Sequence, residues 1–202
     1  MRLHYRLSWL LMRSFVRIVW GFRSSGTDKI PSEGPLIIAS NHVSNWDPIL
    51  LGAGCPRELY FMAKEELFRN PLLGALVRAY NAMPIRRGAL DRRALRAAND
   101  VLKGGNVLLM FPAGTRNESG EVGDPKFGVG FIACMNEATV VPAYLSGANA
   151  LRHTPFRGNT GLELLFGDPI TATKASSSDE YRAFSRRVAE EIRKLKREVD
   201  GR

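Results

Sequence analysis

Short apolar runs and amphipathic stretches alternate along most of this chain. Runs rich in Val, Ile, Leu and Phe are typical of buried strands, and they occur at 35–40, 58–63, 81–85, 106–111, 138–144 and 162–167. Between them, apolar residues recur three or four positions apart, as on one face of a helix, at 70–80, 90–103 and 127–137. Strands that alternate with helices predict an α/β fold, a single domain with a mostly parallel mixed sheet flanked by helices.

The C-terminal stretch predicts a long amphipathic helix over residues 178–199. Its apolar residues step by three and four and form one stripe that docks on the domain: Tyr181, Phe184, Val188, Ile192, Leu195 and Val199. Pro142 lies inside the apolar run 138–144. Because proline has no N–H to donate to a neighbouring strand, we expect this strand at an edge of the sheet, or the proline at its end.

The first 30 residues mix aromatic and aliphatic residues with arginines. In a helix, most of these arginines fall within an arc of about 60°, and the other faces are mostly apolar: Arg2, Arg6, Arg13 and Arg17. The longest uncharged stretch, Leu7 to Met12, is far shorter than the roughly 18 residues of a membrane-spanning helix. Arginines interrupt the apolar region, which argues against a cleaved signal peptide.

We therefore predict an N-terminal amphipathic helical segment, residues 1–30, that lies in a membrane interface, followed by a globular domain over residues 31–202. Its arginines are expected to reach lipid phosphates, with Trp9, Leu10 and Phe15 turned toward the acyl chains. The alternative is a helix that packs on the protein's own core and leaves the arginines in solvent. The membrane interpretation predicts a peripheral, monotopic protein at the cytoplasmic face of a membrane.

The chain is strongly basic, and its positive charge limits the classes of binding partner. Lys and Arg total 29 against 20 acidic residues, a net charge of +9, and residues 1–30 hold six basic residues against one acidic residue. An anionic partner is expected, whether a membrane surface, a phosphate or a nucleic acid. Few aromatic residues alternate with basic ones, as a stacking platform for bases requires, so we expect no nucleic acid. With histidines only at 4, 42 and 153, and with Cys55 and Cys134 as core thiols, no metal site is expected.

The stretch "NHVSNWD" holds the most specific chemistry. His42 follows the predicted strand 35–40, at the rim of the sheet where ligands bind in open α/β folds. Asp47 and Pro48 read as a helix start, with Asp47 at its cap. Across the turn, Asp47 can accept a hydrogen bond from one imidazole nitrogen and support the imidazolium ion. The alternative is a structural histidine beside a helix cap.

The chain has no G-x-S-x-G nucleophile motif to complete a hydrolase triad. The substrate is therefore expected to bring its own hydroxyl, with His42 as general base. Cationic residues come at or just after other predicted strand ends: Lys64, Arg86, Arg87 and Arg116. Because parallel strands end at one edge, these residues predict a site for a phosphate-bearing alcohol.

Taken in order, the motifs resemble those of the glycerolipid acyltransferase family. "NHVSNWD" matches its N-H-x4-D motif, "AMPIRR" its block ending in I-x-R, and "FPAGTRN" its F-P-E-G-T-R-S block, while "VVPAY" resembles its later V-P block. "FMAKEELF" is similar to the segment between the first two blocks. The blocks span roughly residues 35–145, and all of them in family order are highly specific.

The resemblance implies acyl transfer from acyl-CoA or acyl-carrier protein to the hydroxyl of a lysophosphatidate-type acceptor, without a covalent acyl-enzyme or another cofactor. It implies that His42 is the base and Asp47 its partner. It also implies a set of substrate-contacting residues: Asn41, Lys64, Arg87, Gly114, Thr115 and Arg116. Of these, Thr115 is expected to form the turn more than to take part in the chemistry. For the oxyanion, the amides near Gly114 and the Asn41 side chain are both candidates.

Two positions depart from the family pattern. Ala113 stands where the family has Glu, and Asn81 stands where the second block begins with Gly. The missing carboxylate keeps the acceptor open, so another lysophospholipid or polar alcohol is an alternative. A thioester hydrolase of the same fold and a non-catalytic basic membrane-binding protein are the others.

Overall fold

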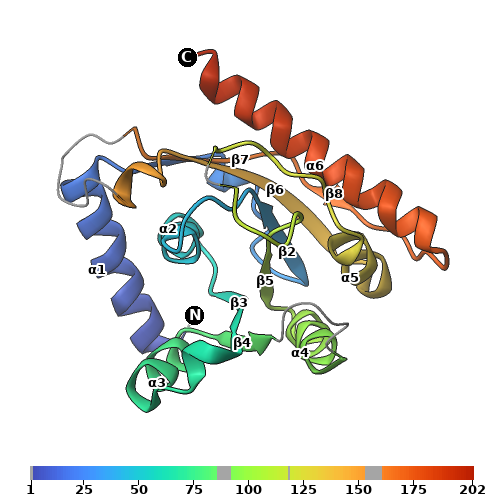
Figure 1. The fold of residues 1–202 in the computed structure, drawn as a ribbon, viewed down its shortest axis with the longest axis horizontal. Coiled ribbons are helices and arrows are strands. Elements are labelled where there is room, and N and C mark those ends of the chain that lie inside the picture. The colour runs from blue at the N-terminus through green and yellow to red at the C-terminus, as the bar shows by residue number, and fades with distance from the viewer. Residues whose placement is uncertain (1, 86–91, 118, 153–160) are drawn as a thin grey trace.

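The computed structural model describes residues 2–85, 92–117, 119–152 and 161–202. Its eight-stranded sheet has helices on both faces (Figure 1). The strands are β1 (Arg23–Ser25), β2 (Leu36–Ser40), β3 (Leu59–Lys64), β4 (Ala82–Ile85), β5 (Val107–Met110), β6 (Thr139–Ser146), β7 (Glu163–Phe166) and β8 (Ile170–Thr171). The α-helices are α1 (Leu3–Trp20), α2 (Asp47–Gly54), α3 (Pro71–Ala79), α4 (Arg92–Lys103), α5 (Gly128–Asn136) and α6 (Ser178–Asp200), with short 3-10 helices at Thr27–Lys29, Glu65–Phe68 and Ala150–Arg152.

The strands run in the order β1-β7-β6-β2-β5-β3-β4, and β8 also pairs with β6. Strands β2 to β6 are all parallel, whereas β7 and β8 are antiparallel to β6, and β1 is parallel to β7. The expected α/β domain with a mostly parallel mixed sheet is confirmed. The carboxyl ends of β2, β3, β4 and β5 therefore share one edge, where the residues of the predicted phosphate site can come together.

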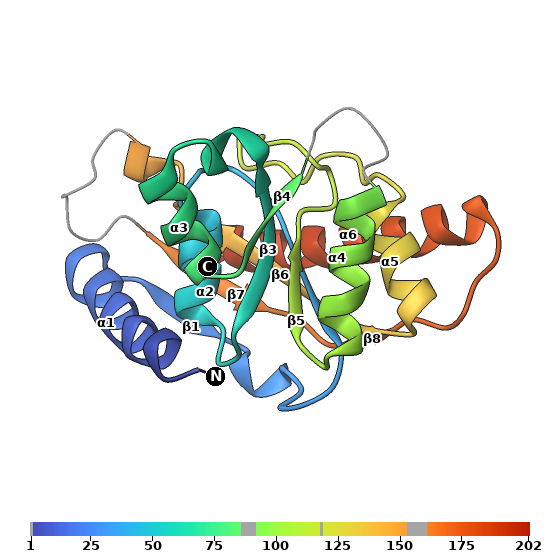
Figure 2. The same ribbon diagram turned by 90° about the horizontal axis from the view of Figure 1, so that it is seen from below.

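Alternate residues of the central strands serve two cores. In β2, Leu36 and Ile38 face a core shared with α1 and α2, while Ile37 and Ala39 face a core shared with α4, α5 and α6. All four of these side chains are fully buried. Figures 1 and 2 show the same layers, with α1 on one side of the sheet and α4, α5 and α6 on the other. A strand buried on both faces is the reason that "LIIAS" reads as a continuous apolar run.

Pro142 is not at an edge, so the sequence expectation for this strand is wrong. β6 is an inner strand that pairs with β2 on one side and with β7 and β8 on the other. The carbonyl of Pro142 accepts a hydrogen bond from Gly167 N at 2.8 Å, just after β7 ends. Since a strand residue directs its N and C=O to the same side, the proline nitrogen faces the gap between β7 and β8, where no ladder bond is lost.

Helix α1 packs on the domain by one face and leaves another apolar face exposed. Tyr5, Val16 and Trp20 are buried. The Trp9 indole donates to the Cys55 carbonyl at 2.9 Å, and the Tyr5 hydroxyl accepts from Leu59 N at 3.1 Å. Trp9 thus faces the protein and not solvent or lipid, contrary to the sequence expectation. The predicted N-terminal segment, residues 1–30, also holds β1, which is one of the two edge strands in the strand order of the sheet.

The exposed face of α1 carries large apolar residues along its whole length, with His4 and Ser14 as the polar residues among them. Its large hydrophobic residues are Leu3, Leu7, Leu10, Leu11, Phe15 and Ile18. At 100° per residue they span an arc of about 140°, with Arg6 and Arg17 along one border. No helix within the described ranges is both long enough and apolar enough to cross a membrane. Helix α1 is therefore apolar on two faces, and the protein covers only one of them.

Candidate active site

His42 and Asp47 meet across the turn between β2 and α2. The Nδ1 atom of His42 lies 2.6 Å from Oδ2 of Asp47. The Asp47 carboxylate is fully buried, whereas the His42 side chain keeps 12% of its surface exposed. An Nδ1–H that donates to the carboxylate leaves Nε2 of the ring as the free, basic nitrogen. The pair therefore has the arrangement of a general base with an orienting acid.

Backbone amides hold the Asp47 carboxylate in place. Oδ2 accepts from Val43 N at 2.6 Å and from Ser44 N at 2.9 Å, in addition to the imidazole. Asp47 is the first residue of α2, and Trp46 occupies the cap position, so the expectation of Asp47 as the cap residue is shifted by one. The carboxylate turns back over the residues that precede the helix. Residues 42–47 thus form a compact loop around Oδ2 of Asp47.

The loop that follows β5 packs on the His42 ring. The Phe111 ring stacks on the imidazole, with centroids 4.0 Å apart and 14° between the planes. The carbonyl of His42 accepts from Asn117 N at 2.8 Å. The two sequence motifs therefore form one unit, in which a ring contact and a backbone hydrogen bond both hold the histidine.

The stretch "FPAGTRN" forms a tight turn at this edge. Gly114 has φ of 69°, a conformation that favours glycine, and its N–H donates to the Phe111 carbonyl at 2.9 Å. The Gly114 amide is thus used within the turn and is not directed at a ligand. Arg116 is exposed, and its Nη1 donates to Oδ1 of Asn45 at 2.9 Å. A guanidinium group is therefore held at the rim, beside the His42 loop.

The other predicted site residues lie at different depths. Thr115 is exposed in the turn, and Lys64 is the exposed last residue of β3. Asn41 is buried: its side chain donates to the Leu145 carbonyl at 2.9 Å and accepts from Leu145 N at 2.8 Å. These two bonds tie the end of β2 to β6, which is a structural role. Arg87, with Arg86, lies outside the described residues.

Three residues at the site were not singled out in the sequence. Phe111 stacks on the histidine, Asn45 holds Arg116, and the Lys126 side chain passes close to Gly114, with Nζ 3.5 Å from where a Cβ on that glycine would lie. Phe111 and Asn45 lie inside the quoted motifs, so their place in the sequence could have marked them as residues of the site. Lys126 follows the turn by ten residues, and no local pattern marks it.

Asn81, which departs from the family pattern, adopts the backbone conformation of a glycine. Its φ is 64°, and its side chain donates to Oε1 of Glu58 at 2.9 Å and to the Leu59 carbonyl at 3.1 Å. It also accepts from Arg2, which forms an ion pair with Glu58. Asparagine tolerates this region better than other side chains do. Here it also anchors the start of α1 to the sheet.

Comparison with known proteins adds independent findings. A family model described as "Acyltransferase" matches residues 21–146. A 1-acyl-sn-glycerol-3-phosphate acyltransferase of Streptococcus pneumoniae is 30% identical over 193 residues, covering 91% of this chain and 71% of that protein. One of Bacillus subtilis is 28% identical over 185 residues, covering 89% and 90%.

A solved structure is similar over nearly the whole chain. The crystal structure of the 1-acyl-sn-glycerophosphate acyltransferase from Thermotoga maritima superimposes with a TM-score of 0.74 and 26% identity. The match covers 95% of this chain and 81% of the other. A shorter match, 36% identical over 86 residues, joins 42% of this chain to 30% of a lyso-ornithine lipid O-acyltransferase of Rhodobacter capsulatus.

Proposed function

This chain belongs to the acyltransferase family, and from that membership we propose that it transfers a fatty acyl group from an acyl thioester to the free hydroxyl of a 1-acylglycerol-3-phosphate, forming phosphatidate. The relatives named above, which match about 90% of the chain, support this acceptor. The observation that carries the proposal is the contact of 2.6 Å between His42 Nδ1 and the buried Asp47 carboxylate, which leaves Nε2 free at the rim of the sheet.

In the proposed reaction, His42 Nε2 removes the proton from the acceptor hydroxyl as its oxygen attacks the thioester carbonyl carbon. The tetrahedral intermediate collapses, the C–S bond breaks, and the imidazolium returns the proton to the departing thiolate. The products are the ester and the free thiol, and no acyl-enzyme forms. General base assistance of this kind contributes typically about 10²–10⁴-fold. Asp47 stabilises the transient imidazolium.

Cationic side chains at the same edge of the sheet are proposed to position the acceptor. Arg116 lies at the rim beside the His42 loop, and Lys64 ends the neighbouring strand β3. We propose that they bind the acceptor phosphate together with Arg87. Anchoring the phosphate aligns the hydroxyl with the base, and such alignment lowers barriers by about 7–11 kcal/mol in favourable cases. The reaction then needs no metal and no cofactor beyond the acyl-CoA or acyl-carrier protein that donates the acyl group.

We also propose that the protein binds an anionic membrane surface, as a peripheral protein on the cytoplasmic face, and not a nucleic acid. The exposed apolar arc of α1, bordered by Arg6 and Arg17, has the form of an interfacial helix. Three large apolar residues on α3, Leu72, Leu73 and Leu76, are exposed as well. The Tyr80 hydroxyl, just after α3, donates to Ser8 at 2.8 Å, so the two helices are neighbours.

A second acceptor class has a specific observation in its favour. Ala113 occupies the turn beside His42 where the family has Glu, and the matching stretch of a lyso-ornithine lipid O-acyltransferase is 36% identical. A hydroxyl on a lysolipid without a phosphate would not need Arg116. An acceptor screen with one labelled acyl thioester separates the two: product from lysophosphatidate supports the proposal, and product only from a phosphate-free lysolipid contradicts it.

The role of His42 is tested by two variants of the catalytic pair. We expect His42→Ala to fold with an unchanged melting profile and to lose acyl transfer, because no other described group at the rim replaces Nε2. Asp47→Asn is expected to lower kcat by about 10³–10⁴-fold, because an amide in place of the carboxylate favours the wrong tautomer. Release of free thiol is the measurement. Turnover by His42→Ala near the wild-type rate would remove the histidine from the mechanism.

A further inference from the structure

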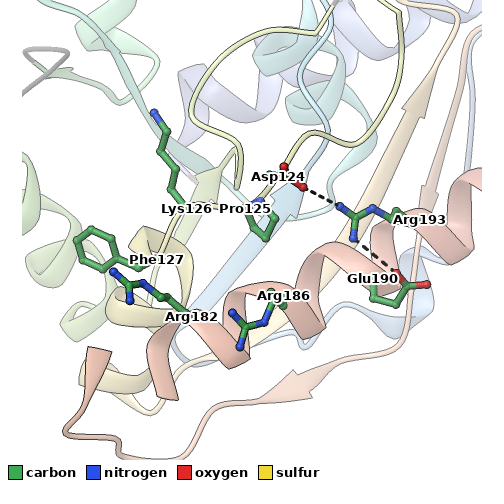
Figure 3. Close-up of a pocket in the computed structure, with 8 residues that line it drawn as sticks. All are labelled: Asp124, Pro125, Lys126, Phe127, Arg182, Arg186, Glu190 and Arg193. Atoms are coloured by element: carbon green, nitrogen blue, oxygen red, sulfur yellow. Dashed lines mark ion pairs between the residues drawn. The ribbon is translucent and has the colours of Figure 1, made fainter. Parts of the chain in front are cut away.

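A groove lies between the segment that leads into α5 and residues 182–193 of α6 (Figure 3). Its volume is about 660 Å³, within the range of about 300–1,000 Å³ that small-molecule sites occupy. The residues that line it are Asp124, Pro125, Lys126, Phe127, Arg182, Arg186, Glu190 and Arg193. No residue of the catalytic pair or of the turn at 111–116 is among them, so the groove is distinct from the site described above.

The basic residues of the groove differ in how far they are already neutralised. Arg193 lies 3.8 Å from the Asp124 carboxylate and 3.6 Å from that of Glu190. Among the described residues, the one ion-pair partner of Arg182 is Asp179, one turn back on its own helix, in an exposed contact of 3.5 Å. Arg186 and Lys126 form no side-chain hydrogen bond or ion pair with another described residue. Two cations are thus available to a ligand, and a third is weakly paired.

An exposed aromatic ring adds a second kind of contact. Phe127, at the start of α5, leaves 42% of its surface in solvent, although its ring also meets Phe131 edge-on. Arginine and an aromatic face together are the groups that hold a phosphate and a nucleobase.

The groove is connected to the catalytic loop through Lys126. Its backbone N–H donates to the Pro112 carbonyl at 2.9 Å, and its side chain passes beside Gly114. Figure 3 shows this side chain pointing away from Arg182 and Arg186. Pro112 follows Phe111, whose ring stacks on His42. A ligand that enters along α6 thus meets Lys126 and then the turn beside the base.

We propose that this groove binds the phosphate-bearing nucleotide end of acyl-CoA, with the pantetheine arm running past Lys126 to bring the thioester to His42. The proposal rests on the proposed function for the thioester chemistry, and it assigns the donor and the place where it binds. Arg186 and Arg182 bind the phosphates, and Phe127 packs on the base. The acceptor phosphate remains with Arg116 on the other side of the turn.

The test uses the full chain and CoA itself as the probe, measured by calorimetry. Arg186→Glu is the variant, and Arg187→Glu is the matched control, because Arg187 is the next residue on the exposed surface of α6 and does not line the groove. We expect Arg186→Glu to raise the Kd for CoA at least about tenfold, since loss of one charge-assisted hydrogen bond is of that size. Arg187→Glu is expected to bind as the wild type does.

Competition and kinetics complete the test. Adenosine 3′,5′-bisphosphate, which has the base and phosphates without the arm, is expected to displace CoA from the wild type. Arg186→Glu should raise KM for acyl-CoA without changing kcat or the KM for the acceptor. With an acylated phosphopantetheine that lacks the nucleotide, the variant and wild type should be equal.

Three results would overturn the proposal: equal effects of the two glutamate variants on CoA binding, no competition by the bisphosphate, or an Arg186→Glu defect confined to acyl-carrier protein as donor. The last would assign the groove to that protein. A wild-type chain that transfers no acyl group would contradict the proposed function. Even then, loss of CoA binding in Arg186→Glu but not in Arg187→Glu would support the groove as the CoA-binding site.

Discussion

Three hydrogen-bond donors converge on one oxygen atom of Asp47, and this convergence explains why the histidine is so well fixed. The imidazole and the amides of Val43 and Ser44 all point at Oδ2. Because the carboxylate is fully buried, these bonds replace the water that Oδ2 would otherwise bind, while Oδ1 has no hydrogen-bond partner among the described residues. The Phe111 ring then closes one face of the imidazole. The proposed base is therefore held in place without substrate, so little reorganisation would remain for the reaction.

Arg116 is the proposed phosphate-binding residue that is easiest to test, because the structure shows its partner, Asn45. We expect Arg116→Ala to raise KM for a phosphate-bearing acceptor at least about tenfold with a smaller change in kcat, because an arginine–phosphate pair binds in ground state and transition state alike. Steady-state kinetics with lysophosphatidate is the measurement.

Asn45→Ala is the matched control for Arg116. It removes only the neutral partner at 2.9 Å and keeps the guanidinium charge, so its effect should be smaller. If Arg116→Ala and Asn45→Ala raise KM equally, Arg116 acts by ordering the loop and not by binding phosphate.

At the scale of single residues, the sequence predicts contacts within one motif better than contacts between residues of different motifs. The His42–Asp47 contact follows from five-residue spacing at a strand end. The pairing of Arg116 with Asn45 joins residues 71 positions apart, and Lys126 reaches Gly114 from a separate segment. Asn41 is predicted to contact substrate, and the structure adds a bond of its amide to Leu145, 104 residues away. Such contacts depend on strand order, which local patterns do not encode.

At the scale of elements, periodicity located the helices and strands because each has one or two consistently buried faces. The strand expected at 138–144 is confirmed, yet its place inside the sheet was wrong. Pro142 is accommodated by a break between β7 and β8, and strand β8 has only two residues. β1, at Arg23–Ser25, was missed because three residues with two serines have no apolar pattern. Both short strands form only because β6 and β7 already provide an edge.

The turn before β4 depends on the backbone conformation of Asn81. We expect Asn81→Ala to be less stable than Asn81→Gly by about 1 kcal/mol, because a Cβ at φ of 64° is strained whereas glycine adopts this conformation freely. Both changes remove the same bonds to Glu58 and Leu59, so their difference isolates the strain. Urea denaturation measures it, and an alanine variant as stable as the glycine variant would contradict the explanation.

The exposed face of α1 is predicted to bind lipid. We expect the double change Leu7→Asn and Leu11→Asn to weaken binding to anionic vesicles about tenfold or more, because burial of each leucine contributes roughly 1.5–3 kcal/mol. Co-sedimentation with vesicles is the measurement. Met135→Asn, on α5 across the sheet, is a control of similar exposure. Vesicle binding that survives the double change, in a protein that remains folded, would assign membrane contact to another surface.

At the scale of the whole molecule, two groups whose ionisation burial suppresses, Tyr5 and Cys55, lie where α1 meets the domain. Burial raises the pKa of Tyr5 and of Cys55 to about 12. Tyr5 accepts from Leu59 N, and the Cys55 carbonyl accepts from Trp9, so both lie where α1 docks. Both thiols, Cys55 and Cys134, are free and buried, as expected for core residues. Docking of the helix is therefore sensitive to alkaline pH.

The unfolding free energy is predicted to fall as pH rises from about 9 to about 12. Below this range both groups are protonated in the folded and unfolded states, and they contribute no pH dependence. Within it the unfolded chain ionises first, so the folded state loses stability. Cys55→Ala removes one titrating group, and the slope of stability against pH should become shallower, whatever the cost of the lost side chain. Urea denaturation across this pH range checks the slope, and an unaltered slope would exclude Cys55 as a contributor.

The Trp46 ring, four residues after His42, packs edge-on against Trp20 at the end of α1, with centroids 5.5 Å apart. The catalytic loop is therefore joined directly to the helix that is proposed to lie in the bilayer. An acceptor would reach the base by lateral diffusion within one leaflet, and its two-chain product would remain there. The reaction should then follow the mole fraction of acceptor among the lipids, and inert lipid added at constant total acceptor should slow it by surface dilution.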